Sequence, residues 1–554
     1  MMLHIQSRHR FLVAVVSAVL LVVGLLLLTT TLVGADTGNA LIEAVKSGDR
    51  AAVRKLISQR VNVNAAEPDG TTSLHWAVRA GDREMTGMLL RAGAKPTTPN
   101  RYGVTPLRLA ALNGSAPLID ALLEAGANPD STNAEGETVL MTAARVGGVD
   151  AVRLLAKRGA NVNAREDWFG ETALMWAAAE NHADTVRALV SLGADINARS
   201  ASKEPPVLEF PQSGGPNMPF PRGGWTALMY AAREGAIDAA RALVELKADM
   251  NVVALPQTDV ALTPQIRQNA GKVGTTALVY AIINAHFDLA AMLVEKGADP
   301  NVEDTSGMAA LYAAVEWNTL QWVQSRPAPI FRDTLDGAGL AKVLLAHGAN
   351  PNATLKAAPI KISLDPGATL NFGRGTTPLM RAARTNDVDS MRYLIDGGAD
   401  VNAALPDGTT VLMIAAGQGL GATRGDGPRI RVPTEAGAVD AVRLLLDKGA
   451  KVNATSTQGA TALHAAVNRG DSVVRLLVER GADLTAKNKF GQTPLDAVSG
   501  AGGGFGRRGG GPAGPPSPAR QATAALLRQL MTERGIPEPA PASAPAPAPA
   551  RTAP

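Results

Sequence analysis

The sequence predicts an all-α solenoid of about twelve helix-turn-helix units with long loop insertions, and two observations lead to this prediction. One pattern recurs along the chain, and the glycines that close it lie 33, 33 and 34 residues apart, at Gly93, Gly126, Gly159 and Gly193. A fixed period of this length is typical of stacked units that bury a shared core. The composition agrees with many short helices and turns, because 56 residues are glycine and only 4% are aromatic.

The chain begins with a segment that predicts export from the cytosol. Three basic residues at 8–10 precede an apolar run from Phe11 to Leu28, and small residues follow up to Ala35. This is the layout of a secretory signal, so we expect residues 1–35 to be a signal peptide that is cleaved after Ala35. The run is also near the lower limit for crossing a bilayer, so an uncleaved N-terminal membrane anchor is the alternative.

Each repeated unit begins with the signals of a short helix. A threonine such as Thr105 can cap the start of the helix, and Pro106 beside it suits the first turn, where its missing N–H costs nothing. Alanine pairs such as Ala143 and Ala144 then allow neighbouring helices to approach closely. A glycine or an asparagine ends this first helix, at Gly81, Gly114, Gly147 and Asn181.

A second helix and a turn complete the unit. Val152, Leu154 and Leu155 give one such helix an apolar stripe, and Gly159 supplies a left-handed stop. Aspartate or asparagine follows in the stretches GADIN and GANVN, which favours a turn. The predicted unit is therefore helix, turn, helix and hairpin loop.

These signatures resemble those of the ankyrin repeat. The family's T-P-L-H-x-A-A and G-A-D-V-N stretches stand here as TALHAAV with GADLTA, TPLMRAA with GADVNA, and TPLRLAA with GANPD. The resemblance covers residues 39–536, nearly everything after the N-terminal segment. It implies a curved solenoid of helix pairs with loops along one edge, a scaffold that is generally used for protein recognition, here in an exported bacterial protein.

The period lengthens in the middle of the chain, where successive units carry predicted insertions that cut no helix. Three of these interrupt the hairpin loop between units, near 201–222, 254–273 and 354–374. Three others separate the two helices of one unit, near 318–336, 417–436 and 499–517. Insertions at such exposed loops are tolerated at modest entropic cost.

The C-terminal end combines a final helix with a low-complexity tail. After the insertion at 499–517, the predicted helix places Leu526, Leu527, Leu530 and Met531 on one face, as the second helix of the last unit. Residues 537–554 are rich in proline and alanine, which predicts a disordered or polyproline-like tail.

No motif for catalysis, metal binding or cofactor binding is recognisable. The absence of cysteine excludes disulfides, thiolate ligands and cysteine nucleophiles. The histidines after the N-terminal segment fit the repeat, and His75 and His464 can bond to the threonine that starts their helix. The glycine run at 417–427 lacks the strand and the following helix of a nucleotide-binding loop. A net charge of only +4 predicts no nucleic-acid partner, and we expect neither an enzyme nor a cofactor.

Residues near the hairpin glycines predict a recognition face. Trp168, Phe169 and Trp225 flank such glycines, at positions that ankyrin-like scaffolds project toward ligands, and the insertions add further aromatic residues as anchors. For the loop at 201–222 the alternative is a tolerated insertion. The residues predicted to bind a partner are Arg79, Tyr102, Arg145, Trp168, Phe169, Phe210, Phe220, Trp225, Arg233, Glu234 and Trp317.

A second set of aromatic residues recurs at one position of the first helix and is assigned to packing between units. These residues are Trp76, Trp176, Tyr230 and Tyr280.

The functional hypothesis is a monomeric, non-enzymatic scaffold of the bacterial cell envelope, periplasmic or secreted, that binds proteins through its concave face and its hairpin-side loops. An uncleaved N-terminal segment would instead anchor it in the inner membrane, facing the periplasm. Two alternatives stay open: an envelope structural or glycan-binding protein, and an enzyme whose site is formed by the insertions. The sequence names no partner, because solenoid surfaces use scattered residues.

Overall fold

The structure is a computed structural model and describes residues 38–201, 223–254, 274–304, 306–317, 333–356, 373–417, 434–467, 469–499 and 518–538. These residues form twelve helix pairs, and the part of the chain they cover contains isolated β-bridges but no strand. The first pair consists of residues 38–46 and α2 (Arg50–Ser58), and the last of α24 (Pro494–Ser499) and α25 (Pro518–Glu533). The predicted all-α solenoid of helix-turn-helix units is confirmed.

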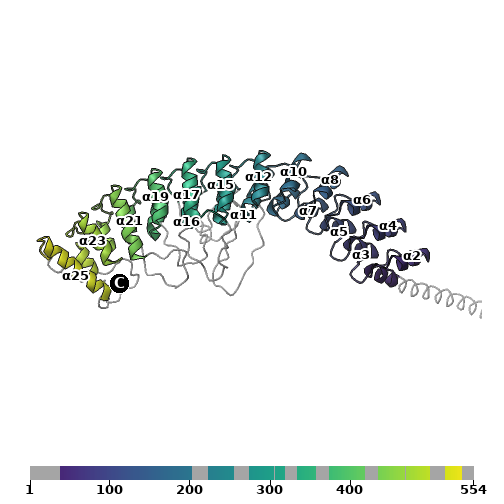
Figure 1. Cartoon of the computed structure of the whole chain (residues 1–554), viewed down its shortest axis with the longest axis horizontal. Helices are drawn as coiled ribbons and strands as arrows, with labels where there is room; N and C mark the ends of the chain where they lie inside the picture. The colour runs from purple at the N-terminus through teal and green to yellow at the C-terminus, as the bar shows by residue number, and fades with distance from the viewer. Residues whose placement is uncertain are drawn as a thin grey trace, which may run out of the picture. The chain divides into compact units, whose positions relative to one another are not determined.

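The chain divides into two compact units, and the division passes through α11 (Ala227–Glu234). In the first unit, the second helices α4, α6, α8 and α10 form one row and the first helices α3, α5 and α7 form another (Figure 1). The helices of this unit are α2, α3 (Ser73–Arg79), α4 (Arg83–Arg91), α5 (Pro106–Leu112), α6 (Ala116–Glu124), α7 (Val139–Arg145), α8 (Val149–Lys157), α9 (Ala173–Ala179), α10 (Ala183–Ser191) and most of α12 (Ile237–Glu245).

The second unit repeats this arrangement with longer connections. Its second helices α15, α17, α19, α21 and α23 again form a row (Figure 1). Its helices are α14 (Ala277–Ile283), α15 (Phe287–Glu295), α16 (Ala310–Trp317), α17 (Gly337–Ala346), α18 (Pro378–Thr385), α19 (Val388–Asp396), α20 (Val411–Ala415), α21 (Glu435–Asp447), α22 (Ala462–Ala466), α23 (Asp471–Glu479), α24 and α25.

Helix starts and ends follow the predicted signals. The Thr105 hydroxyl accepts a hydrogen bond from the Arg108 amide at 3.3 Å, and Pro106 begins α5. The first helices end before residues with a positive φ, including Gly81 at 73° and Asn181 at 61°. The second helices end before glycines with φ between 91° and 95°, at Gly93, Gly126, Gly159 and Gly193. Glycine adopts this left-handed backbone without the steric cost of a Cβ atom.

A ladder of asparagine side chains joins several helix pairs to the pair that follows. The Asn64 amide donates to the Gly93 carbonyl at 3.0 Å, and its oxygen accepts from the Lys95 amide at 2.8 Å. Each asparagine thus satisfies a carbonyl that the end of the next second helix leaves unpaired. The same pair of bonds recurs at Asn163, Asn301, Asn352, Asn402 and Asn453.

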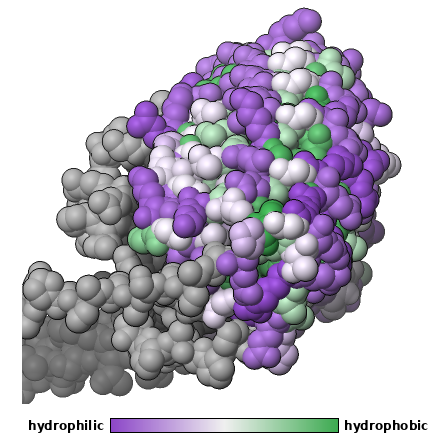
Figure 2. Space-filling view, turned by 90° about the vertical axis from the view of Figure 1, so that its left-hand side faces the viewer, coloured by the Kyte–Doolittle hydropathy of each residue, from purple (hydrophilic) through white to green (hydrophobic). Residues whose placement is uncertain are grey.

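The second unit ends on α25 as predicted. Leu526, Leu527, Leu530 and Met531 are all buried, at 9% exposed or less. The face of the molecule that carries α25 is mostly hydrophilic, with hydrophobic residues in a narrow, interrupted band (Figure 2). A helix with one apolar and one polar side suits the end of a solenoid, because it covers the last core layer and faces water on the other side.

The predicted insertions lie between helices in the structure. Those at 201–222, 254–273 and 354–374 fall between consecutive pairs, and the other three separate α16 from α17, α20 from α21 and α24 from α25. Two predicted bounds overlap helix ends, because α21 begins at Glu435 and α24 ends at Ser499. The structure describes little of these insertions, and it does not describe residues 1–37 or 539–554. In the part that it describes, no helix is long and apolar enough to cross a membrane.

Candidate functional site

In the first of the two compact units, three residues occupy the same repeat position at the ends of successive first helices. Arg79, Leu112 and Arg145 are the last residues of α3, α5 and α7, spaced 33 residues apart. Leu112 is 42% exposed, the Arg145 side chain is 38% exposed, and Arg79 is also exposed. Because they occupy equivalent positions on adjacent helices (Figure 1), they form one surface row, which we call the Arg-Leu-Arg row.

Both arginines of this row lie over tryptophan rings. The Arg79 guanidinium is 5.3 Å from the centroid of the Trp76 ring, and the Arg145 guanidinium is 4.8 Å from that of Trp176. Cation–π contacts of this kind stabilise by about 0.5–1 kcal/mol at exposed sites. Arg145 reaches the tryptophan of the following helix pair, so this contact joins two helix pairs. Packing between repeats is the role that the sequence predicts for this recurring aromatic position.

Trp76 is also contacted by two residues of the preceding helix pair. Its indole N–H donates to Glu67 at 2.7 Å, and Lys46 lies 4.9 Å from the ring centroid while pairing with Glu67 at 2.6 Å. The pair with Lys46 lowers the pKa of Glu67, and the Trp76 indole N–H acts in the same direction. Glu67 is therefore a carboxylate with its partners already in place.

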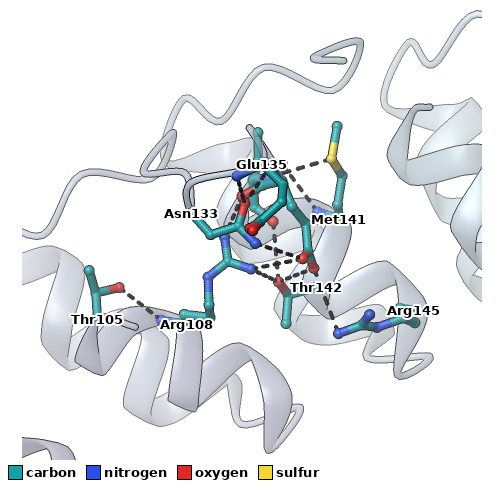
Figure 3. Close-up of polar contacts among 9 residues, drawn as sticks. Thr105, Arg108, Asn133, Glu135, Met141, Thr142 and Arg145 are labelled. Carbon is teal, nitrogen blue, oxygen red and sulfur yellow. Dashed lines mark hydrogen bonds and ion pairs between the residues drawn. The ribbon is translucent and has the colours of Figure 1, made fainter. Parts of the chain in front are cut away.

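Arg108 on α5 forms a buried ion pair with Glu137, and Figure 3 shows Arg108 among its polar contacts. Their side chains are 7% and 11% exposed, and Nη1 of Arg108 lies 3.2 Å from Oε2 of Glu137. Arg108 also donates to the Thr142 hydroxyl at 2.9 Å, and Thr142 in turn donates to Glu137 at 2.9 Å. Asn133 donates to Glu137 at 3.2 Å. Burial lowers the pKa of Arg108, and the Glu137 carboxylate opposes that shift.

Glu137 of this buried pair also contacts Arg145. Glu137 lies 3.7 Å from Arg145, a longer separation than its contact with Arg108. Arg108 therefore has the closer contact with this carboxylate, and Arg145 has the longer one. The Arg145 side chain is 38% exposed, and Figure 3 shows it at the edge of the cluster.

The hairpin tips beside the row expose aromatic side chains. Tyr102 is 69% exposed and Trp168 is 54% exposed, while Phe169 is half-buried. The buried Glu166 carboxylate shapes the second tip by accepting from the amides of Trp168 and Phe169, each at 2.6 Å. Five of the predicted residues therefore belong to the first compact unit and lie on its first helices or hairpin tips. They are Arg79, Tyr102, Arg145, Trp168 and Phe169.

Backbone bonds between tips hold several of them in register. Arg101 donates to the Asp69 carbonyl at 2.7 Å, and Asp167 donates to the Glu135 carbonyl at 2.9 Å. These bonds make the tips an ordered edge rather than separate loops. An ordered edge loses little conformational entropy when a ligand binds.

Trp225 does not project toward a ligand, which corrects the sequence-based expectation. It is 6% exposed, and its backbone N–H donates to the Ser200 hydroxyl at 3.0 Å. Its ring meets Tyr230 edge to face, with centroids 5.3 Å apart. Tyr230 in turn donates to Glu171 at 2.6 Å. Trp225 thus packs within the core of the hairpin.

Three of the predicted residues belong to the second unit. Trp317 is the last residue of α16 rather than part of an insertion, is half-buried, and meets Phe287 edge to face at 6.0 Å. Arg233 and Glu234 form an ion pair at 3.3 Å. Phe210 and Phe220 lie outside the described residues.

Some surface residues were missed by the sequence reasoning. Leu112 ends α5 and Val146 directly follows α7, and they are 42% and 39% exposed. Phe490, which is 67% exposed, precedes a hairpin glycine in the second unit as Tyr102 does in the first. Alignment of the units would have found Leu112 and Phe490, because each shares its repeat position with a residue that was chosen.

The histidines take structural positions. His75 bonds to the Thr72 hydroxyl at 2.8 Å, and His464 bonds to the Thr461 hydroxyl at 2.9 Å, as predicted. His182 and His286 contact the backbone oxygens of Arg145 and Arg233. Across the described ranges, no three residues among histidine, aspartate and glutamate gather as a metal site would require.

Family comparisons agree with this architecture. Models described as ankyrin repeats (3 copies) match residues 19–100, 107–200, 336–423 and 433–500, and the first of these stretches begins within the predicted export segment. A model of ankyrin repeats (many copies) matches 174–244, and one of a single ankyrin repeat matches 273–305. The chain belongs to the ankyrin repeat family. Repeats of this family are generally protein–protein interaction modules, and proteins built from them are typically non-enzymatic scaffolds.

Proposed function

We propose that this protein is a non-enzymatic scaffold of the bacterial cell envelope that binds a partner protein through its concave ankyrin face and its hairpin-side loops. The observation that carries the proposal is the alignment of Arg79, Leu112 and Arg145 on three successive units, beside the exposed tips Tyr102 and Trp168. Arginine and the large aromatic residues are the types that most often dominate binding energy at protein interfaces.

Pre-organisation of these side chains supports a binding role. The two arginines rest on tryptophan rings, and the tips are tied by backbone bonds, so few rotamers need to be fixed when a partner arrives. A face of this kind needs no cofactor and no catalytic group.

Site-specific photo-crosslinking in cells tests this proposal. A benzophenone side chain at Leu112 on α5 should form an adduct with a discrete partner, and one at Glu124 on the second helix α6 should not. Both positions are exposed, so the pair controls for accessibility. Equal adducts from the two positions would contradict the proposal, and retention on cell-wall polysaccharide without any protein adduct would favour the glycan-binding alternative.

The envelope location rests on residues 1–35 of the sequence, whose basic start and apolar run are typical of export signals. We propose a periplasmic or secreted protein, with anchoring in the inner membrane if the segment is retained. Protease treatment of spheroplasts should degrade the protein, and mass analysis of its N-terminus should find Asp36 first if the signal is cleaved. Full protection from the protease would contradict export.

A further inference from the structure

We infer, resting on the proposed function, that the Arg-Leu-Arg row binds an extended acidic segment of the partner. The segment carries two carboxylates about five or six residues apart and an apolar side chain between them. The carboxylates meet Arg79 and Arg145, and the apolar side chain covers Leu112.

The charge of the row is of one sign. Helices α3, α5, α7 and α9 contain the arginines Arg79, Arg108 and Arg145 and no aspartate or glutamate. Within the described part of the chain, no carboxylate pairs with Arg79, and Arg145 has only the 3.7 Å contact to Glu137. A surface with this excess attracts a partner of negative charge.

Three carboxylates in the hairpins that precede α3 and α7 already have partners. Glu67 pairs with Lys46 and accepts from Trp76, and Glu137 pairs with Arg108 and accepts from Thr142. Asp69 accepts from the amide and the hydroxyl of Thr71, and these bonds lower its pKa. None of the three is placed to neutralise Arg79 as well as its own partners.

The tryptophans leave the arginine donors available. A guanidinium that lies over an aromatic ring uses the face of its planar group, whereas a carboxylate is bound through the N–H groups at its edge. Trp76 and Trp176 can therefore hold the two arginines while the N–H groups make charge-assisted bonds to a ligand.

The spacing of the ligand follows from the helices. Packed helices lie roughly 8–10 Å apart, so α3 and α7, with α5 between them, are separated by roughly 16–20 Å. An extended strand advances about 3.3 Å per residue, and that separation corresponds to about five or six residues. Leu112 on α5 lies midway and offers the contact for an apolar side chain.

Selection from a phage library of random dodecapeptides on the full chain tests the inference. We expect enriched peptides to carry two acidic residues at this spacing with an apolar residue between them. The R79Q/R145Q variant should bind a synthetic copy of the enriched peptide at least about tenfold more weakly, because it loses the charge-assisted bonds to both carboxylates. The R79K/R145K variant should fall in between, since lysine keeps the charge without the forked donors.

The matched control is R83Q/R153Q. Arg83 and Arg153 are exposed on the second helices α4 and α8 and form no ion pair within the described residues. This variant has the same net charge as R79Q/R145Q and should bind like the parent, and circular dichroism should show both variants folded.

Enriched peptides without the acidic pair, equal binding by both variants, or no enrichment at all would each overturn the inference. The first two outcomes leave the proposed scaffold function standing, because the crosslinking experiment at Leu112 tests that function separately.

Discussion

Arg108 occupies the repeat position at which other units carry His75 and His464, and all three side chains perform the same task. Each reaches a backbone carbonyl of the next hairpin: His75 contacts that of Val104, Arg108 donates to that of Glu137, and His464 contacts that of Gln492. Arginine is the longer and permanently charged choice, so it also requires the buried carboxylate of Glu137.

Removal of Arg108 should be costly because it leaves a buried charge. We expect R108M to lower the free energy of unfolding by about 3 kcal/mol, since an unpaired buried carboxylate is strongly destabilising. The double variant R108M/E137Q should recover part of this loss, because no buried charge is left without its partner. Urea unfolding followed by circular dichroism measures both, and equal losses in the two variants would show that the charge is not the cause.

The buried histidines predict a loss of stability in mild acid. Burial lowers the pKa values of His75 and His464 below that of an unfolded histidine. The unfolded chain therefore binds more protons, so stability is complete above the unfolded pKa and falls as the pH decreases through about 6.5. H75Q/H464Q should show a smaller loss between about pH 7 and about pH 5.5 in thermal unfolding. H347Q, which alters an exposed histidine, should show the parent's full loss.

At the scale of the element, the asparagine ladder explains how short helices become a continuous stack. Each asparagine spans two units with two hydrogen bonds, where the hairpin of one unit meets the second-helix end of the next. Helices of seven to nine residues are only marginally stable in isolation, so hydrogen bonds between helix pairs contribute much of the stability of the stack.

Substitution of one ladder residue should destabilise the contact between two consecutive helix pairs. N352A removes the bonds to Gly398 and Asp400, and we expect a loss of about 1–2 kcal/mol. Hydrogen exchange at the Asp400 amide should quicken. T354A, at an exposed position two residues later, should leave that amide unchanged. Unchanged exchange in N352A would mean that the ladder is not a significant restraint.

The elements could be predicted from the sequence because their causes are local. Threonine caps and left-handed glycines act within one helix pair, so the residues that start and end these helices could be predicted, whereas the bounds beside the insertions were off by a few residues. The Arg108–Glu137 pair was missed because its partners are 29 residues apart and their contact depends on how two units stack. Trp225 was misplaced because a position beside a hairpin glycine does not reveal which way the side chain turns.

At the scale of the whole molecule, every helix pair has the same surface positions, whose residues can differ. In the first compact unit, one of these positions carries arginine, leucine and arginine in successive helix pairs, and the hairpin tips expose Tyr102 and Trp168. The scaffold class followed from the sequence with its family resemblance. The row itself required the structure, which showed that Leu112 is exposed and that both arginines lie over tryptophans.

The most direct test of this account is hydrogen–deuterium exchange of the full chain with and without the partner captured at Leu112. We predict protection in α3, α5 and α7 and at the tips 100–104 and 166–171, with the second helices α4, α6 and α8 unchanged. Protection confined to α4, α6 and α8 would contradict the assignment of the binding face.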